Sequence, residues 1–268
     1  MNLIGLHSLI KDTDEYLQLT RDAGSQAESI VAIDTAKPLL LACLHHDLGV
    51  PMLIVTPNAR EAKRLHERLI SWCAPNSRVH LFPELDVLPY EHLTPDSSIV
   101  EQRLRVLALL SEWNKLSFAS PPLIVTSAHA LSQKTVAVTD FASACLAVKK
   151  GMRTNLNQLL AQWVGIGYDV TETVETPGTV SKRGGIIDVY SPNNDYPARI
   201  EFFGDEVESI RWFDPATQRS VGLADSLTII PAREMLSPNR EQIETAFDRL
   251  DLSNCSDQTR DAMREDVE

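Results

Sequence analysis

The stretch that decides the fold runs Ala198-Arg-Ile-Glu-Phe-Phe-Gly-Asp-Glu-Val-Glu-Ser-Ile-Arg-Trp-Phe213. It contains two runs rich in β-branched and aromatic residues, which are typical of strands. Gly204-Asp205 separates the two runs, and a two-residue link that contains glycine is a good signal for a hairpin. The stretch therefore predicts an antiparallel β-hairpin.

The predicted hairpin has two chemically different faces. Because alternate residues of a strand share a face, Ile200 and Phe202 point to one side, which we expect to pack on a core. Arg199 and Phe203 point to the other side. Arginine and aromatic residues are enriched where proteins bind partners. The pattern alone leaves two alternatives open: a binding surface, or a Phe203 covered by another element beside an ordinary surface charge at Arg199.

The neighbouring sequence extends the antiparallel pattern over residues 146–213. Gly184-Gly185 precedes the apolar run Ile186-Ile-Asp-Val-Tyr190, which we expect to be a strand. Ser191-Pro-Asn-Asn194 follows it with residues that favour turns. Four acidic residues surround the hairpin, and we expect them to face water and not to form a catalytic pair; they are Glu201, Asp205, Glu206 and Glu208.

The first 130 residues have a different pattern, in which short apolar runs alternate with segments of helical periodicity. We expect strands at Ser29–Ala32, Pro51–Thr56, Val79–Phe82 and Pro122–Thr126, and helices at Leu39–His46, Ala59–Trp72 (with Asn58 as N-cap) and Ser98–Trp113. Strands that alternate with helices predict a parallel sheet covered on both faces.

Together these patterns predict an α/β domain interrupted by an α+β insertion. We assign residues 1–144 and 225–268 to the α/β domain and residues 145–224 to the insertion. Ser226–Ile230 is an apolar run that we expect to return to the first sheet, and Pro238–Leu250 has helical spacing. Residues 239–268 hold four basic and nine acidic side chains, so they form either a solvated helix face or an interaction tail. We expect the chain to be part of a longer protein.

Composition narrows the function classes. The net charge of −12 disfavours a DNA-binding module with a broad phosphate-binding face. No apolar run approaches the roughly 20 residues that span a bilayer, and the acidic start of the chain lacks the order of a signal peptide, so we expect a cytoplasmic protein. Its four cysteines are far apart, which favours reduced thiols over a zinc site or disulfides.

The turn after the first predicted strand is a candidate nucleotide site. Nucleotide-binding α/β domains carry G-x-x-x-x-G-K-[ST] there, with backbone N–H groups and the lysine on the phosphates and the hydroxyl on magnesium. Lys37 fits this pattern, whereas Val31 and Ala36 replace both glycines. Pro38 removes the hydroxyl and an N–H donor, and Asp34 adds a negative charge. We predict a degenerate phosphate loop that does not bind ATP.

Several motifs of the chain resemble the UvrB and transcription-repair coupling factor (Mfd) families. In the middle of the chain they are Gly167-Tyr168, Pro177-Gly178, Arg183-Gly-Gly-Ile-Ile-Asp-Val-Tyr190, Pro197-Ala-Arg-Ile-Glu-Phe-Phe-Gly-Asp-Glu-Val-Glu-Ser-Ile-Arg211 and Phe213-Asp-Pro-Ala-Thr-Gln-Arg219. The run from Phe82-Pro-Glu-Leu-Asp-Val-Leu-Pro-Tyr90 to Glu101-Gln-Arg-Leu104 resembles the coupling factor family in particular. The resemblance extends from Ser29 to Pro231.

The altered phosphate loop distinguishes the two families. UvrB keeps a working loop and is a helicase-like ATPase, whereas the coupling factors carry a UvrB-like N-terminal module that has lost it. The resemblance therefore implies a degenerate P-loop, helicase-like parallel-sheet domain with an inserted α+β domain that binds UvrA. It implies no catalytic activity and no cofactor in this segment. The alternative is an ATP-binding UvrB-type helicase fragment that acts in nucleotide excision repair.

The resemblance also implies a partner and the residues that contact it. In the family the insertion docks on UvrA, the damage-recognition ATPase, and brings it to stalled RNA polymerase by mimicking UvrB. The motif positions that carry this contact fall on Arg183, Arg199 and Phe203, with Tyr190 and Arg211 as weaker candidates at the rim. In the family an ATP-dependent translocase that engages double-stranded DNA, and a domain that binds RNA polymerase, lie further along the chain.

Overall fold

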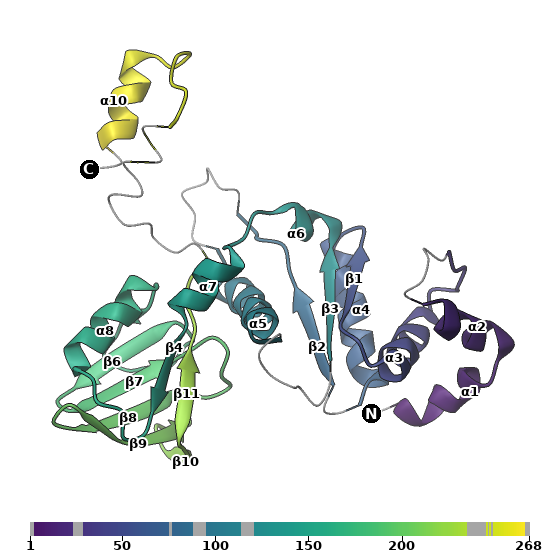
Figure 1. Ribbon diagram of the computed structural model, residues 1–268, viewed down its shortest axis with the longest axis horizontal. Helices are drawn as coiled ribbons and strands as arrows, with labels where there is room; N and C mark the ends of the chain where they lie inside the picture. Colours follow the sequence, from purple (N-terminus) through teal and green to yellow (C-terminus); the bar gives the residue numbers. More distant parts are fainter. Residues whose placement is uncertain are drawn as a thin grey trace.

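The computed structural model describes residues 3–23, 29–74, 77–87, 95–113, 121–234, 245, 247 and 249–265. An α/β unit with a small sheet lies beside a β-rich unit, as Figure 1 shows. Within the described residues no helix is both long enough and apolar enough to cross a membrane. The predicted helix at Pro238–Leu250 lies mostly outside the described residues, and the final helix, α10, spans Asp257–Glu265.

The α/β unit is built on a three-stranded parallel sheet in the order β1-β3-β2. The strands are β1 (Met52–Thr56), β2 (Arg78–Phe82) and β3 (Pro122–Ser127). The main helices are α3 (Lys37–Leu48), α4 (Ala59–Trp72) and α5 (Ser97–Trp113). Asn58 caps α4 by accepting a hydrogen bond from the backbone N–H of Glu61 at 3.0 Å. These elements confirm the predicted strand and helix alternation from residue 37 onward.

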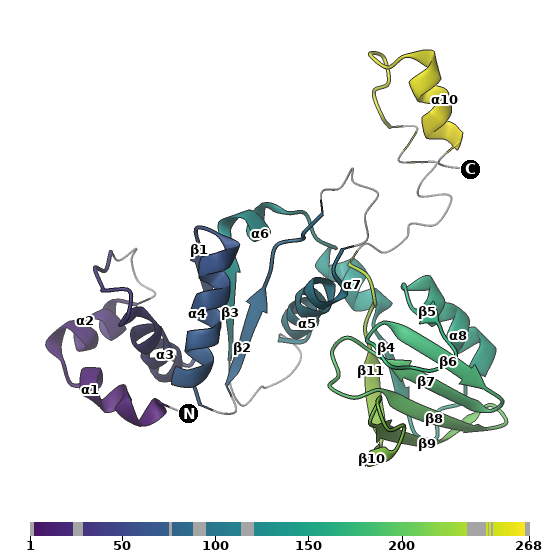
Figure 2. The same cartoon turned by 180° about the vertical axis from the view of Figure 1, so that it is seen from behind.

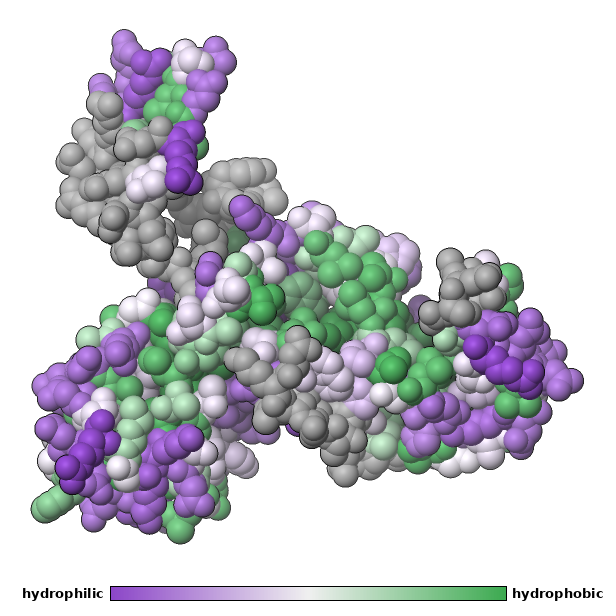
Figure 3. All heavy atoms as spheres, viewed as in Figure 1, coloured by the Kyte–Doolittle hydropathy of each residue, from purple (hydrophilic) through white to green (hydrophobic). Residues whose placement is uncertain are grey.

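Helices cover the two faces of the parallel sheet unequally. Leu123 and Val125 of β3 pack with residues of α3 and α4 on one face, which Figure 2 shows toward the viewer. Ile124 packs on the other face with Val106 of α5. On that face Leu53 of β1 is 54% exposed, and Figure 3 shows hydrophobic surface around β1. Coverage of both faces is confirmed for β3 and is wrong for the edge strand β1.

The strand predicted at Ser29–Ala32 is absent. Residues 29–33 adopt no regular structure, and Val31 is fully exposed. A short apolar run becomes a strand only where a neighbouring strand completes its hydrogen-bond ladder, and no described strand lies against this run. The helix that follows, predicted at Leu39–His46, spans Lys37–Leu48.

Short helices complete the α/β unit. The 3-10 helix η1 (Ile4–His7), α1 (Ser8–Lys11) and α2 (Asp14–Asp22) precede α3, and α6 (Ala128–Ser132) and α7 (Val138–Ala144) follow β3. The N-terminal helices are attached to α3 through Asp47, whose carboxylate accepts hydrogen bonds from Tyr16 at 2.7 Å and from Lys11 at 2.6 Å. Hydrogen bonds from Lys11, His46 and Tyr16 lower the pKa of Asp47 to about 2 against the opposing effect of its burial.

The β-rich unit contains a six-stranded sheet in the order β10-β9-β8-β7-β6-β5. Its strands are β5 (Asp169–Val170), β6 (Thr179–Arg183), β7 (Ile186–Tyr190), β8 (Ala198–Phe203), β9 (Glu206–Phe213) and β10 (Ser220–Ala224). All neighbouring pairs are antiparallel except β5 with β6. The hairpin of β8 and β9 closes with Phe203 opposite Glu206, which confirms the prediction from Gly204-Asp205.

One face of this sheet is buried under α8 (Leu156–Gly165) and a two-stranded sheet of β4 (Leu146–Lys149) and β11 (Ser226–Ile229). The fully buried Trp163 of α8 and Ile200 of β8 belong to this core. The expectation that residues 226–230 return to the first sheet is wrong, because β11 pairs antiparallel with β4 and buries Leu227 in this core. The domain boundaries at residues 145 and 225 stay a prediction.

Candidate partner-binding surface

The face of the six-stranded sheet opposite α8 brings most of the predicted contact residues together. Asp188, Arg199 and Arg211 are directly paired across β7, β8 and β9, so they form one row of side chains. Arg183 and Phe203 lie toward one end of the same face. We call this face, with those five residues, the arginine face. Ile200 lies on the opposite, buried face, as strand alternation predicts.

Phe203 is a highly exposed apolar side chain on the arginine face. It is 80% exposed at the last position of β8, so no described element covers it. Beside it lies an open hollow of about 600 Å³ that is also lined by Arg153, Asn155 and Glu206. An aromatic ring held at the end of a rigid strand next to a hollow suits insertion into, or contact with, a complementary partner surface.

Arg199 is held by a buried carboxylate. Its Nε donates to Asp188 Oδ1 at 2.7 Å and its Nη2 to Asp188 Oδ2 at 2.9 Å. Asp188 itself is 2% exposed. The hydrogen bonds to Asp188 raise the pKa of Arg199, against the opposing effect of desolvation. The Arg199 Cζ atom also lies 4.8 Å from the centre of the Phe213 ring, a cation–π distance.

The guanidinium of Arg183 is more exposed and more weakly hydrogen-bonded than that of Arg199. Its side chain is 57% exposed, and within the described residues its hydrogen bond is a long one of 3.4 Å from Nη2 to Asp188 Oδ2. Arg211 is 42% exposed and its Nη2 donates to Glu201 Oε2 at 2.5 Å. Hydrogen bonds from Ser209 and then Arg211 lower the pKa of Glu201, against the opposing effect of its burial. The arginine face thus carries internal ion pairs and one largely available guanidinium.

Tyr190 lies within the fold and not at the rim. Its side chain packs with Val174 and Phe213, and it is 9% exposed. Its hydroxyl donates to the carbonyl oxygen of Asp195 at 2.9 Å. Burial raises the pKa of this phenol. Tyr190 therefore supports the end of β7 and the turn that follows it, while its role in partner contact stays a prediction.

The sequence analysis did not identify Asp188 of the arginine face or Gln218, which contacts Arg199 from a neighbouring turn. Asp188 interrupts an otherwise apolar strand, and an acidic side chain inside such a run is the signal that could have identified it. Gln218 lies in the turn after β9, and its Oε1 accepts from Arg199 Nη2 at 3.4 Å. No local pattern in the sequence places this turn beside Arg199, because the contact depends on how β9 and β10 are joined.

The predicted phosphate-loop residues lie at the start of α3. Lys37 donates to Asp34 Oδ1 at 2.7 Å, and this hydrogen bond lowers the pKa of Asp34. Pro38 is buried in the first turn of the helix, where a proline is well tolerated. Val31 and Ala36 belong to the segment that precedes α3 without forming a strand. The degenerate phosphate loop is therefore not confirmed as a strand–loop–helix element.

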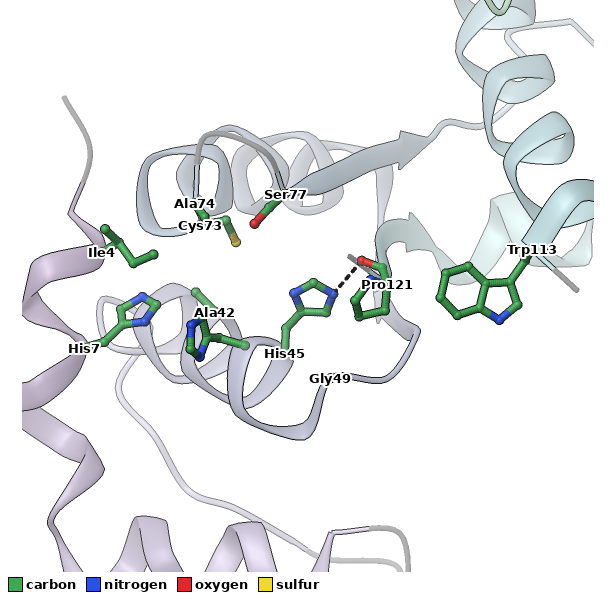
Figure 4. A pocket seen from close by; sticks show the side chains of 11 residues that line it. Ile4, His7, Ala42, His45, Gly49, Cys73, Ala74, Ser77, Trp113 and Pro121 are labelled. Carbon is green, nitrogen blue, oxygen red and sulfur yellow. Dashed lines mark hydrogen bonds between the residues drawn. The ribbon is translucent and has the colours of Figure 1, made fainter. Parts of the chain in front are cut away.

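A separate cavity of about 400 Å³ lies where β2 and β3 begin, and Figure 4 shows the side chains that line it. His45 and His7 border it, and their Nε2 atoms lie 3.0 Å from the carbonyl oxygen of Pro121 and 2.9 Å from that of Trp72. Burial lowers the pKa of both imidazoles. Among the described residues no group of three histidine, cysteine or acidic side chains is arranged to hold a metal ion.

Comparison with known proteins identifies the class of the β-rich unit. Residues 146–235 match the UvrB interaction domain family, so the chain carries a UvrB interaction domain. The matched range includes all the strands of the arginine face.

Most of the chain is similar to proteins named transcription-repair-coupling factor. The protein from Myxococcus xanthus is 34% identical in an alignment of 243 residues that covers 86% of this chain and 20% of the relative. The protein from Bacillus subtilis is 27% identical over 92% of this chain and 20% of the relative, and that from Mycobacterium tuberculosis is 30% identical over 87% and 19%. The chain thus spans about a fifth of the length of these relatives.

Proposed function

We propose that this chain is a non-catalytic docking module of a transcription-repair coupling factor and that its arginine face binds UvrA. The observation that carries the proposal is the 80% exposed Phe203 beside Arg183 and Arg199 within the UvrB interaction domain. In this proposal Phe203 is the apolar anchor and Arg183 supplies a charge-assisted contact to a carboxylate of the partner.

We also propose the biological use of this contact. A UvrB-like surface on a protein that reaches a stalled RNA polymerase would deliver UvrA to that site by mimicking UvrB. The engagement of RNA polymerase and of double-stranded DNA would be the work of segments beyond this chain, which spans about a fifth of its relatives.

The ATP-binding alternative has one observation in its favour. Lys37 is at the start of a helix that leads into β1 of the parallel sheet, and the lysine of a phosphate loop also stands at the start of a helix. Two observations weigh against it: the ion pair of Lys37 with Asp34, and Pro38 in place of the magnesium-binding hydroxyl.

Two calorimetric titrations separate the two functions. The 268-residue chain is titrated with UvrA and, in a parallel experiment, with ATP and magnesium. We expect heat of binding with UvrA and none with ATP. Binding of ATP that is lost in Lys37→Ala would establish the nucleotide-binding alternative, and an absence of binding by folded protein to UvrA would overturn the docking function. Lys63→Ala, an exposed lysine change on α4, is the matched control for the ATP arm.

A further inference from the structure

We propose that Asp188 and Gln218 are positioning residues that hold Arg199 in one orientation before any partner arrives. The inference rests on the proposed function for its binding consequence, but its structural claim concerns the free protein. It starts from the turn Phe213-Asp-Pro-Ala-Thr-Gln-Arg219, a motif whose role neither the strand pattern nor the exposed Phe203 explains.

The first observation is the way in which Asp188 pairs with the guanidinium. Asp188 takes the Nε and Nη2 edge of Arg199, at 2.7 and 2.9 Å, so this edge is not available to a partner. Within the described residues Nη1 of Arg199 makes no hydrogen bond. A two-point pair fixes the plane of the guanidinium as well as its position, because both groups are planar. The unused Nη1 edge therefore has a defined direction.

The second observation is independent and concerns the backbone of Gln218. It has φ of 58°, the single positive value at a non-glycine residue in the described part of the chain. This conformation is uncommon for a residue with a Cβ atom and is retained where surrounding contacts impose it. Here the contacts are visible: Nε2 of Gln218 donates to the carbonyl oxygens of Pro215 at 2.8 Å and Val174 at 3.3 Å. The amide is thereby turned so that Oε1 faces Arg199.

The third observation concerns the aromatic ring beside the guanidinium. The Phe213 ring lies 4.8 Å from Arg199 Cζ and is itself buried. Carboxylate, amide and ring thus restrain three sides of one side chain, leaving Arg199 only 27% exposed. Such a frame lowers the entropy that a long side chain loses on binding, which is the benefit of preorganisation. Arg183, with its long contact to the same carboxylate, is only weakly restrained.

The frame can be tested in the free chain by measuring exchange with water of the Arg199 Nε–H proton in ¹⁵N-labelled protein. We expect slow exchange in the natural chain and at least about tenfold faster exchange in Asp188→Asn, which loses the charge-assisted acceptor. Gln218→Gly relaxes the strained backbone and removes the amide, and it should give an intermediate rate. Exchange that is unchanged in both folded variants would overturn the frame, whether or not UvrA binds.

A double-mutant cycle tests the consequence for binding. We expect Asp188→Asn to weaken UvrA binding about tenfold in the natural chain. In the Arg199→Ala background the same change should weaken binding less than about threefold, because the effects of coupled residues are not additive. An equal loss in both backgrounds would show that Asp188 does not act through Arg199. If the natural chain itself fails to bind UvrA, the proposed function fails while the exchange measurement still decides the frame. Asp47→Asn, a paired carboxylate in the other unit, is the matched control.

Discussion

Arg103 of α5 and Glu234 form a two-point ion pair that holds the segment after β11 against α5. Arg103 Nε donates to Glu234 Oε2 at 2.6 Å, and Nη2 donates to Oε1 at 2.8 Å. Arg103 is fully buried, and its Cζ lies 4.1 Å from the centre of the Phe82 ring. Its Nη1 donates to the carbonyl oxygen of Pro83 at 2.7 Å. The guanidinium is therefore satisfied on several sides, as a buried charge requires.

Removing one partner of this pair should be strongly destabilising. We expect Glu234→Ala to lower the free energy of unfolding by about 3–5 kcal/mol, because it leaves an unpaired charge in a buried site. Chemical denaturation of the 268-residue chain measures this change. Lys63→Ala, a change at an exposed lysine of α4, is the control and should alter this free energy by less than about 0.5 kcal/mol. A loss no larger than that of the control would contradict a stabilising role for the buried pair.

His80 of β2 should make the fold sensitive to acid. Its Nε2 is buried without a hydrogen-bond partner, and burial, assisted by the nearby charges of His66, Arg78 and Arg105, lowers its pKa to about 4. The unfolded chain has the ordinary value near 6.5, so it binds more protons than the folded chain between these pH values. The contribution of His80 to the free energy of unfolding is therefore fully present above pH 6.5 and is lost as the pH falls toward 4.

The variant His80→Phe should reduce this pH dependence. The contribution of one such histidine is about 2 kcal/mol at pH 5, so the variant should unfold with a flatter dependence on pH between 7 and 4. Thermal unfolding at several pH values measures the slope, with the exposed His129→Phe as control. An unchanged slope in His80→Phe would contradict the assignment of this effect to His80.

Phe203→Ala should separate binding from stability. A central aromatic anchor typically contributes about 2 kcal/mol or more, so we expect at least about 30-fold weaker binding to UvrA. The ring is 80% exposed, so the free energy of unfolding should change by less than about 0.5 kcal/mol. Val164→Ala on α8 is the control, because that apolar side chain is 45% exposed on the helix that covers the opposite face of the sheet. Equal binding losses in both variants would remove the special role of Phe203.

Tyr168→Phe should lower the stability of the chain and leave its binding to UvrA unchanged. The Tyr168 hydroxyl donates to the carbonyl oxygen of Ile230 at 2.8 Å and lies 3.0 Å from Ser191 Oγ, in a site where the residue is 2% exposed. Its removal should lower the free energy of unfolding by about 1–3 kcal/mol, because a buried acceptor is left unsatisfied. UvrA binding by the folded variant should be unchanged in calorimetry. A binding loss without destabilisation would mean that the β4–β11 side of the unit also contacts the partner.

Local patterns predicted the elements whose causes lie within a few residues. Asn58 capped a helix with the periodicity of 59–72, and Gly204-Asp205 closed a hairpin, because caps and turns are short-range interactions. Strand alternation also separated Ile200 from Arg199. The site residues Arg183, Arg199 and Phe203 came from motif resemblance and lie on one face, although their contact with UvrA stays a prediction.

The amino-acid sequence by itself determined the helix at Ala59–Trp72, the hairpin at Gly204-Asp205 and the faces of β8, since periodicity, capping and turn chemistry act locally. Only the tertiary structure decided which strands pair and which charges meet. The apolar run 29–32 forms no strand, whereas residues 226–229 pair with β4. The sequence of an apolar strand does not specify which strand it will pair with. Likewise Asp188 meets Arg199 only because β7 and β8 align in register, which brings a buried charge to the partner that compensates its desolvation.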